Sequence, residues 1–178
     1  MKIFISGGCK NGKSSLAESC TCALSQGKPL YYLATMISHD SEDEERIRRH
    51  VASRAGKGFI TIERGRNITE CLKEADVHGT FLLDAVTSLF SNEMFHDGIV
   101  DMESAQRTAR ELAELAESVE NIVFVSDYIY SDDVQYDIYT EEYRKGLALC
   151  DKTLAGICDT VVEVCTGQYV VYKGKLPL

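Results

Sequence analysis

Short apolar segments alternate with segments of helical periodicity along this chain, and this alternation constrains its fold more than any other feature. The apolar segments are continuous and rich in β-branched and aromatic residues, which favours strands buried on both faces. Strands that alternate with helices in this way predict an α/β fold, with a mostly parallel sheet flanked by helices. We expect residues 1–178 to form one domain, because the sequence contains no repeat, low-complexity segment or linker.

The individual elements follow from the same patterns. Strands are expected at residues 2–6, 29–35, 59–63, 79–85 and 121–127. Helices are expected at residues 13–25, 41–54, 67–75, 86–95, 102–118 and 141–157. Asn67 is expected to be the N-cap of the third helix. Residues 160–165 and 168–174 predict a terminal hairpin that adds an antiparallel edge to the sheet.

A glycine-rich stretch, GGCKNGKS, joins the first expected strand to the first expected helix and fits the pattern G-x-x-x-x-G-K-[S/T]. Glycines let successive backbone N–H groups turn toward a phosphate group, and the helix start adds positive dipole charge. Lys13 would reach the β- and γ-phosphates, and the Ser14 hydroxyl would ligate Mg²⁺. The strand and helix that flank the loop argue against an incidental glycine-rich turn. We therefore predict a P-loop NTPase-like fold that binds a nucleoside triphosphate through Gly7, Gly8, Cys9, Lys10, Asn11, Gly12, Lys13 and Ser14.

A Mg²⁺ ion beside such a loop calls for a carboxylate at the end of a buried strand. Two aspartates occupy this kind of position, Asp84 at the end of TFLLD and Asp127 at the end of IVFVSD. Either could instead cap the turn that follows its strand. We favour Asp84 as the metal ligand beside Ser14 and keep Asp127 as the alternative.

The segment DSEDEERIRRHVASR, residues 40–54, carries Arg46, His50 and Arg54 at four-residue spacing, which places them on one face of a helix. Neighbouring cations disfavour a protonated imidazole, so His50 would stay neutral and nucleophilic. The two arginines could bind a phosphate group that His50 attacks. The alternative is a solvated helix whose acidic residues pair with its arginines.

Composition limits the partners and the location of the chain. The 28 acidic residues outnumber the 19 basic ones and give a formal net charge of −9, so no nucleic-acid partner is expected. No run of about 18 apolar residues is present, which predicts no membrane span. The opening MKIFIS is too short, and reaches glycine too early, for a signal peptide. The seven cysteines form no C-x-x-C pair, which favours structural thiols in a reducing cytoplasm over a zinc site.

The glycine-rich loop and the charged helix together resemble one family, the adenosylcobinamide kinase/adenosylcobinamide-phosphate guanylyltransferases of cobalamin biosynthesis. The family's opening, [T/S]-G-G-x-x-x-G-K-S, matches residues 6–14, and its second strand ends in Ala-Thr, as residues 34–35 do here. Its pattern D-x-E, three residues, R-I-x-x-H-x-x-x-R matches Asp40, Glu42, Arg46, Ile47, His50 and Arg54. The resemblance covers most of the first 95 residues, and the helix pattern is its more specific part.

The resemblance implies roles for single residues. His50 matches the histidine that carries a GMP intermediate, and Asp84 falls where the family has an acid. The positions that contact the nucleotide correspond to residues 7–14 and to Ala34, Thr35, Met36, Val51, Ala52, Ser53, Arg54 and Glu63. The family would use ATP or GTP with Mg²⁺ to phosphorylate a corrinoid hydroxyl, and GTP to transfer GMP to the product. The resemblance also implies a homo-oligomer, a trimer with its site near a subunit boundary.

The chain departs from the family after about residue 125. The family follows its later strand with N-E-V-G, whereas this chain has Ser126, Asp127 and Tyr128. The family's helix motif D-x-x-G-R-x-N corresponds by register to Lys145, Ala148, Leu149 and Asp151. Two other functions fit such changes: a P-loop kinase of a small molecule in which His50 is incidental, and a GTP- or ATP-binding regulatory protein without catalysis.

Overall fold

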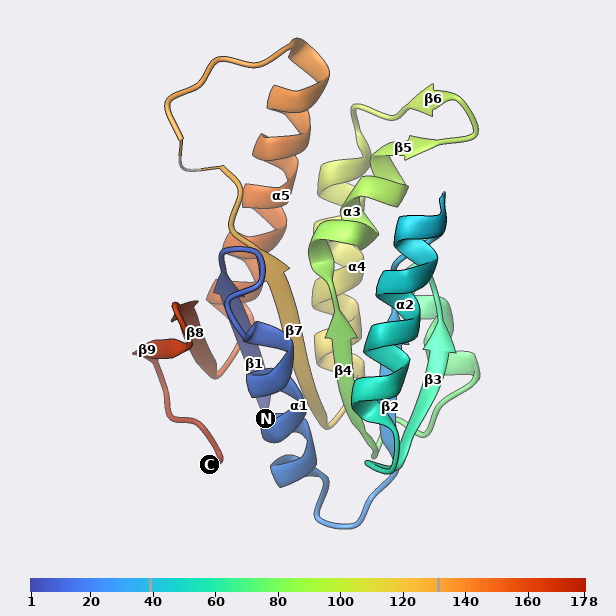
Figure 1. The fold of residues 1–178 in the computed structure, drawn as a ribbon, viewed down its shortest axis with the longest axis vertical. Helices are drawn as coiled ribbons and strands as arrows, with labels where there is room; N and C mark the ends of the chain where they lie inside the picture. Colours follow the sequence, from blue (N-terminus) through green and yellow to red (C-terminus); the bar gives the residue numbers. More distant parts are fainter. Residues whose placement is uncertain (39, 131) are drawn as a thin grey trace.

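A mostly parallel sheet forms the centre of the molecule (Figure 1). The computed structural model describes residues 1–38, 40–130 and 132–178, without the side chains of Arg46, His50 and Ser53. Within this part, seven strands form the sheet in the order β3-β2-β4-β7-β1-β8-β9. All neighbouring strands are parallel except β8 and β9. The expected α/β fold with an antiparallel C-terminal hairpin is therefore confirmed.

The bounds of most elements agree with the sequence patterns. The strands of the sheet are β1 Lys2–Gly7, β2 Leu30–Ala34, β3 Phe59–Glu63, β4 Thr80–Asp84, β7 Asn121–Asp127, β8 Thr160–Cys165 and β9 Gln168–Lys173. The α-helices are α1 Lys13–Ser25, α2 Ser41–Arg54, α3 Val86–Met94, α4 Ser104–Ser118 and α5 Ile138–Ile157. None of these helices has the length and apolar character that a membrane span requires.

Three local expectations are corrected by the structure. Helix α5 begins at Ile138 rather than at residue 141, because the Asp137 carboxylate accepts the N–H groups of the first turn. The segment after Asn67 is a 3₁₀ helix, η1 Ile68–Lys73, and Asn67 makes no side-chain cap. Its backbone N–H instead donates to the buried Glu93 carboxylate, with an N···O distance of 2.6 Å.

A short antiparallel pair, β5 Phe95–His96 and β6 Ile99–Val100, connects α3 to α4 and was not expected. The turn between the two strands is Asp97-Gly98, and both residues have positive φ angles of 52° and 74°. Asp-Gly at the two central positions is a typical hairpin signal. The signal was present in the sequence, but strands of two residues leave no alternating pattern beside it.

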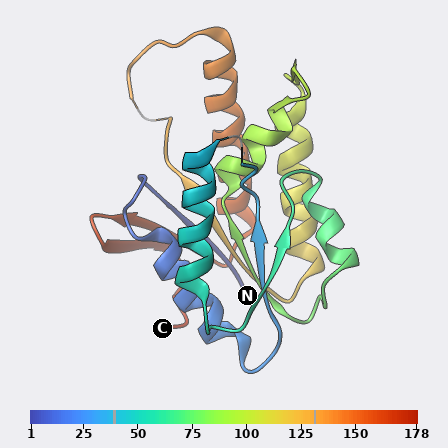
Figure 2. The same ribbon diagram turned by 45° about the vertical axis from the view of Figure 1, so that its right-hand side comes forward.

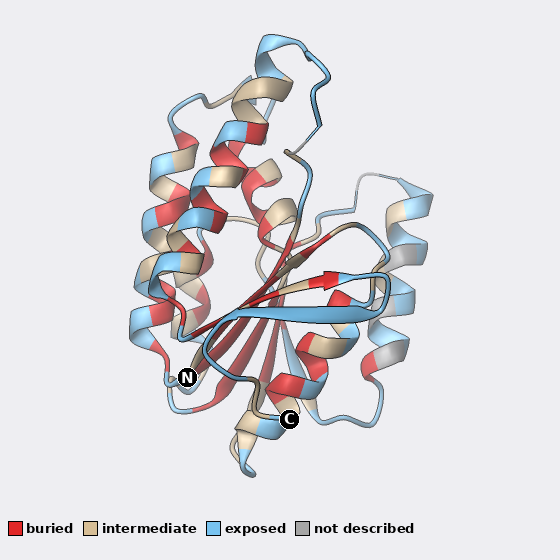
Figure 3. Cartoon of the chain, turned by 90° about the vertical axis from the view of Figure 1, so that its left-hand side faces the viewer, coloured by how far each residue is buried: buried red, intermediate tan, exposed pale blue. Residues whose placement is uncertain are grey.

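Helices cover the sheet on both faces, and each face has its own core. On one face, Ala17 and Cys20 of α1 pack against Ile3, Ile5 and Val125. On the other face, α3, α4 and α5 pack against alternate residues of the same strands, such as Phe4, Phe81 and Phe124. Figure 3 shows the buried central strands, and it shows that β9 is exposed along its length. The two-sided burial accounts for the continuous apolar runs of the central strands.

The carboxyl ends of the parallel strands bring the candidate site residues to one edge of the sheet. The register pairs Gly7 with Asp127 and Ala34 with Asp84. Helix α2 lies on the same side of the sheet as α1 (Figures 1 and 2). In open α/β sheets, ligands bind outside the carboxyl ends of the strands.

Candidate functional site

The loop between β1 and α1 has the backbone that a phosphate cradle requires. At Gly7, where φ is 155°, an added Cβ would lie 2.3 Å from the carbonyl oxygen of Val164 in the neighbouring strand. At Gly12, φ is 93°, a left-handed conformation that glycine adopts without strain. Helix α1 begins directly afterwards at Lys13. The N–H groups of its first turn therefore face the end of the loop, as in anion sites at helix N-termini.

Lys13 is only 6% exposed and is held by two contacts at the base of the loop. Its Nζ donates to the carbonyl oxygen of Gly8 at 2.6 Å and pairs with Oδ1 of Asp127 at 2.7 Å. Asp127 is fixed in turn, because its own N–H donates to the Thr87 hydroxyl at 2.8 Å. A buried ammonium needs such a partner. Asp127, which the sequence left as the alternative metal ligand, is thus the counter-ion of Lys13 in this structure.

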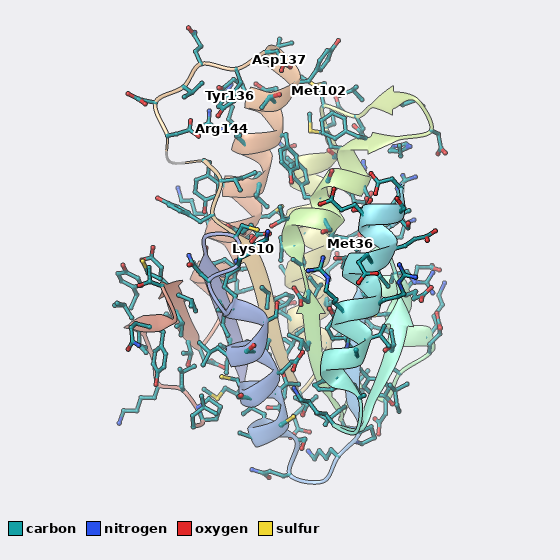
Figure 4. The ribbon with its side chains drawn as sticks, viewed as in Figure 1. Lys10, Met36, Met102, Tyr136, Asp137 and Arg144 are labelled. Carbon is teal, nitrogen blue, oxygen red and sulfur yellow. The ribbon has the colours of Figure 1, made fainter. Side chains whose placement is uncertain are left out.

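A cavity of about 650 Å³ opens between the loop, the ends of β2 and β4, and α2. Lys10 and Met36, labelled in Figure 4, line it from the loop and from the segment after β2. It also brings together most of the other expected site residues: Cys9, Asn11, Gly12, Lys13, Ser14, Ala34, Arg54, Glu63 and Asp84. A cavity of this size is within the range of small-molecule sites.

Some expected residues lie elsewhere. Gly7, Gly8, Thr35, Val51 and Ala52 are not among the residues that line the cavity. Val51 and Ala52 are exposed on α2, whereas Thr35 is fully buried. The predictions for Arg46, His50 and Ser53 concern side chains outside the described part of the chain, although all three positions belong to α2.

Thr35 connects the ends of β2 and β4. Its hydroxyl accepts the N–H of Ala85 and donates to the carbonyl of the same residue, both at 2.8 Å. The side-chain amide of Asn92 donates to the Thr35 carbonyl at 2.8 Å. The Thr35 side chain is therefore engaged within the protein, and it fixes the strand end from which Ala34 and Met36 face the cavity.

Arg54 lines the cavity from the last turn of α2. Its guanidinium carbon lies 3.3 Å from the centre of the Tyr32 ring, which is a close cation–π contact. The Tyr32 hydroxyl donates to Oδ2 of Asp84 at 3.1 Å. Burial, together with the negative charge of Asp84, raises the pKa of Tyr32 and keeps this hydroxyl a donor. Tyr32 looked like a core residue in the sequence, and its β-strand pattern gave no signal of this role.

The Arg54 guanidinium is 7% exposed, and its Nη1 atom is buried without a hydrogen-bond partner among the described residues. An unpartnered guanidinium N–H in a cavity is costly unless a ligand supplies an acceptor. Phosphate oxygens are suitable acceptors for this group. Arg54 and Lys13 thus offer positive charge to the same cavity from two different elements.

The residues present also suit a Mg²⁺ ion that is shared with phosphates. The Ser14 hydroxyl and the Asp84 carboxylate both line the cavity. No cluster of three or more His, Cys, Asp or Glu that could hold a metal alone occurs in the described part of the chain. Mg²⁺ in nucleotide sites is typically held by one or two protein ligands together with phosphate oxygens and water. The donor set therefore fits a nucleotide-bound ion rather than a closed metal centre.

Comparison with known proteins identifies the family. The model of the cobinamide kinase / cobinamide phosphate guanyltransferase family matches residues 3–171, nearly the whole chain. The chain belongs to this family. The resemblance noted in the sequence is confirmed, and it extends through the region after residue 125. A search of curated protein sequences found no match.

Solved structures support the fold alone. The flagellar accessory protein FlaH from Methanocaldococcus jannaschii has a TM-score of 0.51 at 11% identity, with coverage of 98% of this chain and 78% of that one. A KaiC-like protein from Pyrococcus horikoshii OT3 has a TM-score of 0.50 at 10% identity, with coverage of 98% and 80%. These similarities and the sheet confirm the P-loop NTPase-like fold. Family membership supports a nucleotide-binding transferase that acts on cobinamide.

The segment before α5 differs from the N-E-V-G sequence expected after β7, and it is held to that helix by Arg144. Its guanidinium donates to Oδ1 of Asp132 at 3.0 Å and to the carbonyl of Val134 at 3.3 Å. It also lies 4.9 Å from the centre of the Tyr136 ring. Figure 4 shows Arg144, Tyr136 and Asp137 together at this end of the molecule. This segment is thus stabilised by its own contacts with α5.

Asp151 of α5 is a buried acid that the sequence did not single out as a site residue. It stands where the cobinamide kinase family motif has asparagine, is 3% exposed, and accepts a hydrogen bond from the Tyr130 hydroxyl at 2.9 Å. Burial, with a smaller contribution from the nearby charge of Asp127, raises the pKa of Asp151 to about 7. The hydrogen bond from Tyr130 acts in the opposite direction and lowers the pKa.

Asp151→Asn should remove a pH-dependent penalty on folding. The folded pKa of about 7 lies above the ordinary value of 3.8, so between these values the unfolded chain has lost a proton that the folded chain retains. Stability from this group is therefore complete below about pH 4 and is lost as pH rises to about 7. Asp151→Asn changes the free energy of unfolding at each pH. We expect this change to be more stabilising at pH 8 than at pH 4.5, by roughly a few kcal/mol.

Denaturant unfolding at the two pH values measures this difference. Asp133→Asn, at an exposed aspartate in the segment before α5, is the matched control and should show no such dependence. Equal stability changes in Asp151→Asn at both pH values would show that Asp151 is ionised in the folded protein.

Proposed function

We propose that the protein is a bifunctional cobinamide kinase and cobinamide-phosphate guanylyltransferase that acts through a GMP–His50 intermediate. The observation that carries the proposal is the pair of buried cations, Lys13 and Arg54, which line one cavity from the loop and from α2. A triphosphate needs positive charge along its length, and the two cations would supply it from two different elements. Family membership directs this chemistry to cobinamide and its phosphate.

The kinase reaction would use the loop. Lys13 would leave Asp127 to contact the β- and γ-phosphates, while backbone N–H groups of the loop hold the phosphate oxygens. Ser14 and Asp84 would hold Mg²⁺, which neutralises charge on the phosphates when bound. The acceptor is a hydroxyl group of cobinamide, and ATP or GTP is the donor. Charge stabilisation and positioning supply most of the catalysis in such transfers.

The guanylyltransferase reaction would use α2. A ring nitrogen of His50 would attack the α-phosphorus of GTP, so that a P–N bond forms as the P–O bond to pyrophosphate breaks. A phosphate oxygen of cobinamide phosphate would then attack the same phosphorus, and the P–N bond would break. Arg54, one turn after residue 50 on the same helix, would stabilise the charge that develops on the phosphoryl oxygens.

The proposal also covers the substrates and the oligomeric state of the protein. The partners are a nucleoside triphosphate and a corrinoid small molecule. We further propose a homo-oligomer, a trimer in which a neighbouring subunit lies near the site. The base of the nucleotide would lie outside the phosphate cradle. Ala34, Met36 and Glu63 line the cavity there, and we propose that they distinguish GTP from ATP.

Intact-mass spectrometry after incubation with GTP and Mg²⁺ tests the proposal. We expect the mass of the protein to increase by one GMP. This adduct should be labile in acid and resistant to base, and it should disappear when cobinamide phosphate is added. Phosphorylation of a hydroxyl substrate without an adduct would favour a small-molecule kinase in which His50 is incidental. Tight GTP binding with neither activity would favour a regulatory protein.

Arg54→Ala should weaken GTP binding while the chain remains folded. A charge-assisted hydrogen bond contributes about 1.5–3 kcal/mol, so the dissociation constant should rise roughly 10- to 100-fold. Titration calorimetry measures the affinity, and thermal unfolding checks the fold. Arg48→Ala is the matched control, because Arg48 is exposed on the same helix and pairs with Glu45. Unchanged affinity in Arg54→Ala would remove this residue from the nucleotide site.

A further inference from the structure

Helix α2 carries two of the proposed functional positions, and the contacts described for it with the rest of the protein include two at its C-terminal end. Among its described side chains, Arg54 is the buried one, and the others are exposed or half-buried. Figure 2 shows the helix in front of the sheet, with its C-terminal end beside α1. A helix held at one end is oriented by the contacts at that end, so these contacts determine where its other residues lie.

The second contact at this end is an ion pair between Glu18 of α1 and Lys57 of the turn after α2. Glu18 is 5% exposed, whereas Lys57 is exposed. The backbone N–H of Lys57 donates to the carbonyl of Arg54 at 3.1 Å, which ties the turn to the last residue of the helix. Removing the partner of a buried carboxylate is far more costly than breaking an exposed pair. This contact therefore restrains α2 more strongly than the helix's own surface pairs do.

Glu18 is also one of the charged residues near Tyr32. The negative charges of Asp84 and Glu18 and the positive charge of Arg54 all act on the Tyr32 hydroxyl. Glu18 lies one helical turn beyond Ser14 on α1, the helix whose first turn supplies Lys13. One rigid helix thus carries both the end of the phosphate cradle and the anchor for α2.

We propose that Glu18 is a positioning residue that fixes α2 relative to the phosphate cradle through Lys57. The carboxylate does not reach the cavity lining, so it acts through the orientation of α2 and of position 50, while Arg54 is held by its own contact with Tyr32. The ion pair sets the distance between the nucleotide held by the loop and position 50 of the helix. The activity readout for this role rests on the proposed guanylyl transfer, and the structural readout does not.

Glu18→Gln should slow formation of the GMP adduct about tenfold or more while the dissociation constant for GTP stays within about twofold. Lys57→Met should give the same result, and the double variant should be no slower than either single one, because both changes remove one contact. Amide hydrogen exchange in residues 41–58 should become faster in both single variants. Glu120→Gln, which breaks an exposed ion pair with Lys28 elsewhere, is the matched control and should change neither readout.

The two readouts separate this inference from the proposed function. If the parent protein forms no adduct, the guanylyl-transfer proposal fails, and faster exchange confined to residues 41–58 still supports the anchor. If exchange and adduct rate are both unchanged in Lys57→Met, the anchor is wrong. An equal loss of GTP affinity and adduct rate in Glu18→Gln would also overturn it, because the residue would then support the cradle itself. Lys57 is exposed, so Lys57→Met keeps the test valid if Glu18→Gln does not fold.

Discussion

Lys13→Ala should lower nucleotide affinity and turnover by about 100-fold or more. The ammonium group is buried at the start of α1 and is already aimed at the loop, where it contacts the Gly8 carbonyl. The ammonium group already lies at the loop, so its loss removes a large electrostatic contribution to phosphate binding. Fluorescent-nucleotide binding and a coupled kinase assay measure the two quantities. Lys152→Ala, at an exposed lysine of α5, is the control and should change neither.

A structural role of Lys13 can be distinguished from its role in binding. Lys13→Ala leaves the Asp127 carboxylate without its partner, which should cost about 1–3 kcal/mol of stability. The double variant Lys13→Ala/Asp127→Asn should recover that stability without recovering nucleotide affinity. Nucleotide binding that returns with stability would show that the lysine supports the fold alone, and the assignment of the phosphate cradle would fail.

His50→Ala should abolish the GMP adduct and leave kinase activity at least partly intact. Transfer of a γ-phosphoryl group needs positioning and charge stabilisation rather than a covalent histidine. His50→Asn should behave in the same way, because an amide can occupy the space but cannot attack phosphorus. Intact-mass spectrometry detects the adduct, and phosphate transfer to cobinamide detects the kinase.

His78→Ala is the control, since His78 lies in the exposed turn before β4. A full GMP adduct in His50→Ala would move the nucleophile elsewhere in the protein. It would also remove the main reason to prefer guanylyl transfer over a simple kinase reaction on a small hydroxyl compound.

The fold was largely predictable because its signals are local. The bounds of α2 were correct, since Asp40 is a strong N-cap whose carboxylate accepts two N–H groups of the first turn. The central strands were correct because burial on both faces leaves continuous apolar runs. The strand order was not predictable, because it depends on which helices pack on which face. The 3₁₀ helix after Asn67 was missed, since the buried Glu93 that takes the Asn67 N–H lies far along the chain.

The candidate site divides in the same way. The loop from Gly7 to Ser14 was predictable, because its backbone conformation requires particular residues within a short sequence motif. The pairing of Lys13 with Asp127 arises only because β7 lies beside β1. The contact of Arg54 with Tyr32 joins α2 to β2. Neither residue, seen in the sequence, predicts that the other lies beside it. Asp151 gave no signal, because an acid on a helix looks solvated until its burial is known.

The pairing of Lys13 with Asp127 means that the loop carries its own internal anion. An incoming ligand must compete with a carboxylate that is covalently part of the protein and always at hand. A single phosphate or sulfate ion, with few other contacts, competes poorly, whereas a triphosphate that also contacts Arg54 can compensate for the exchange. We therefore expect the ion pair to act as a threshold for occupancy, which would favour polyphosphate ligands over small anions.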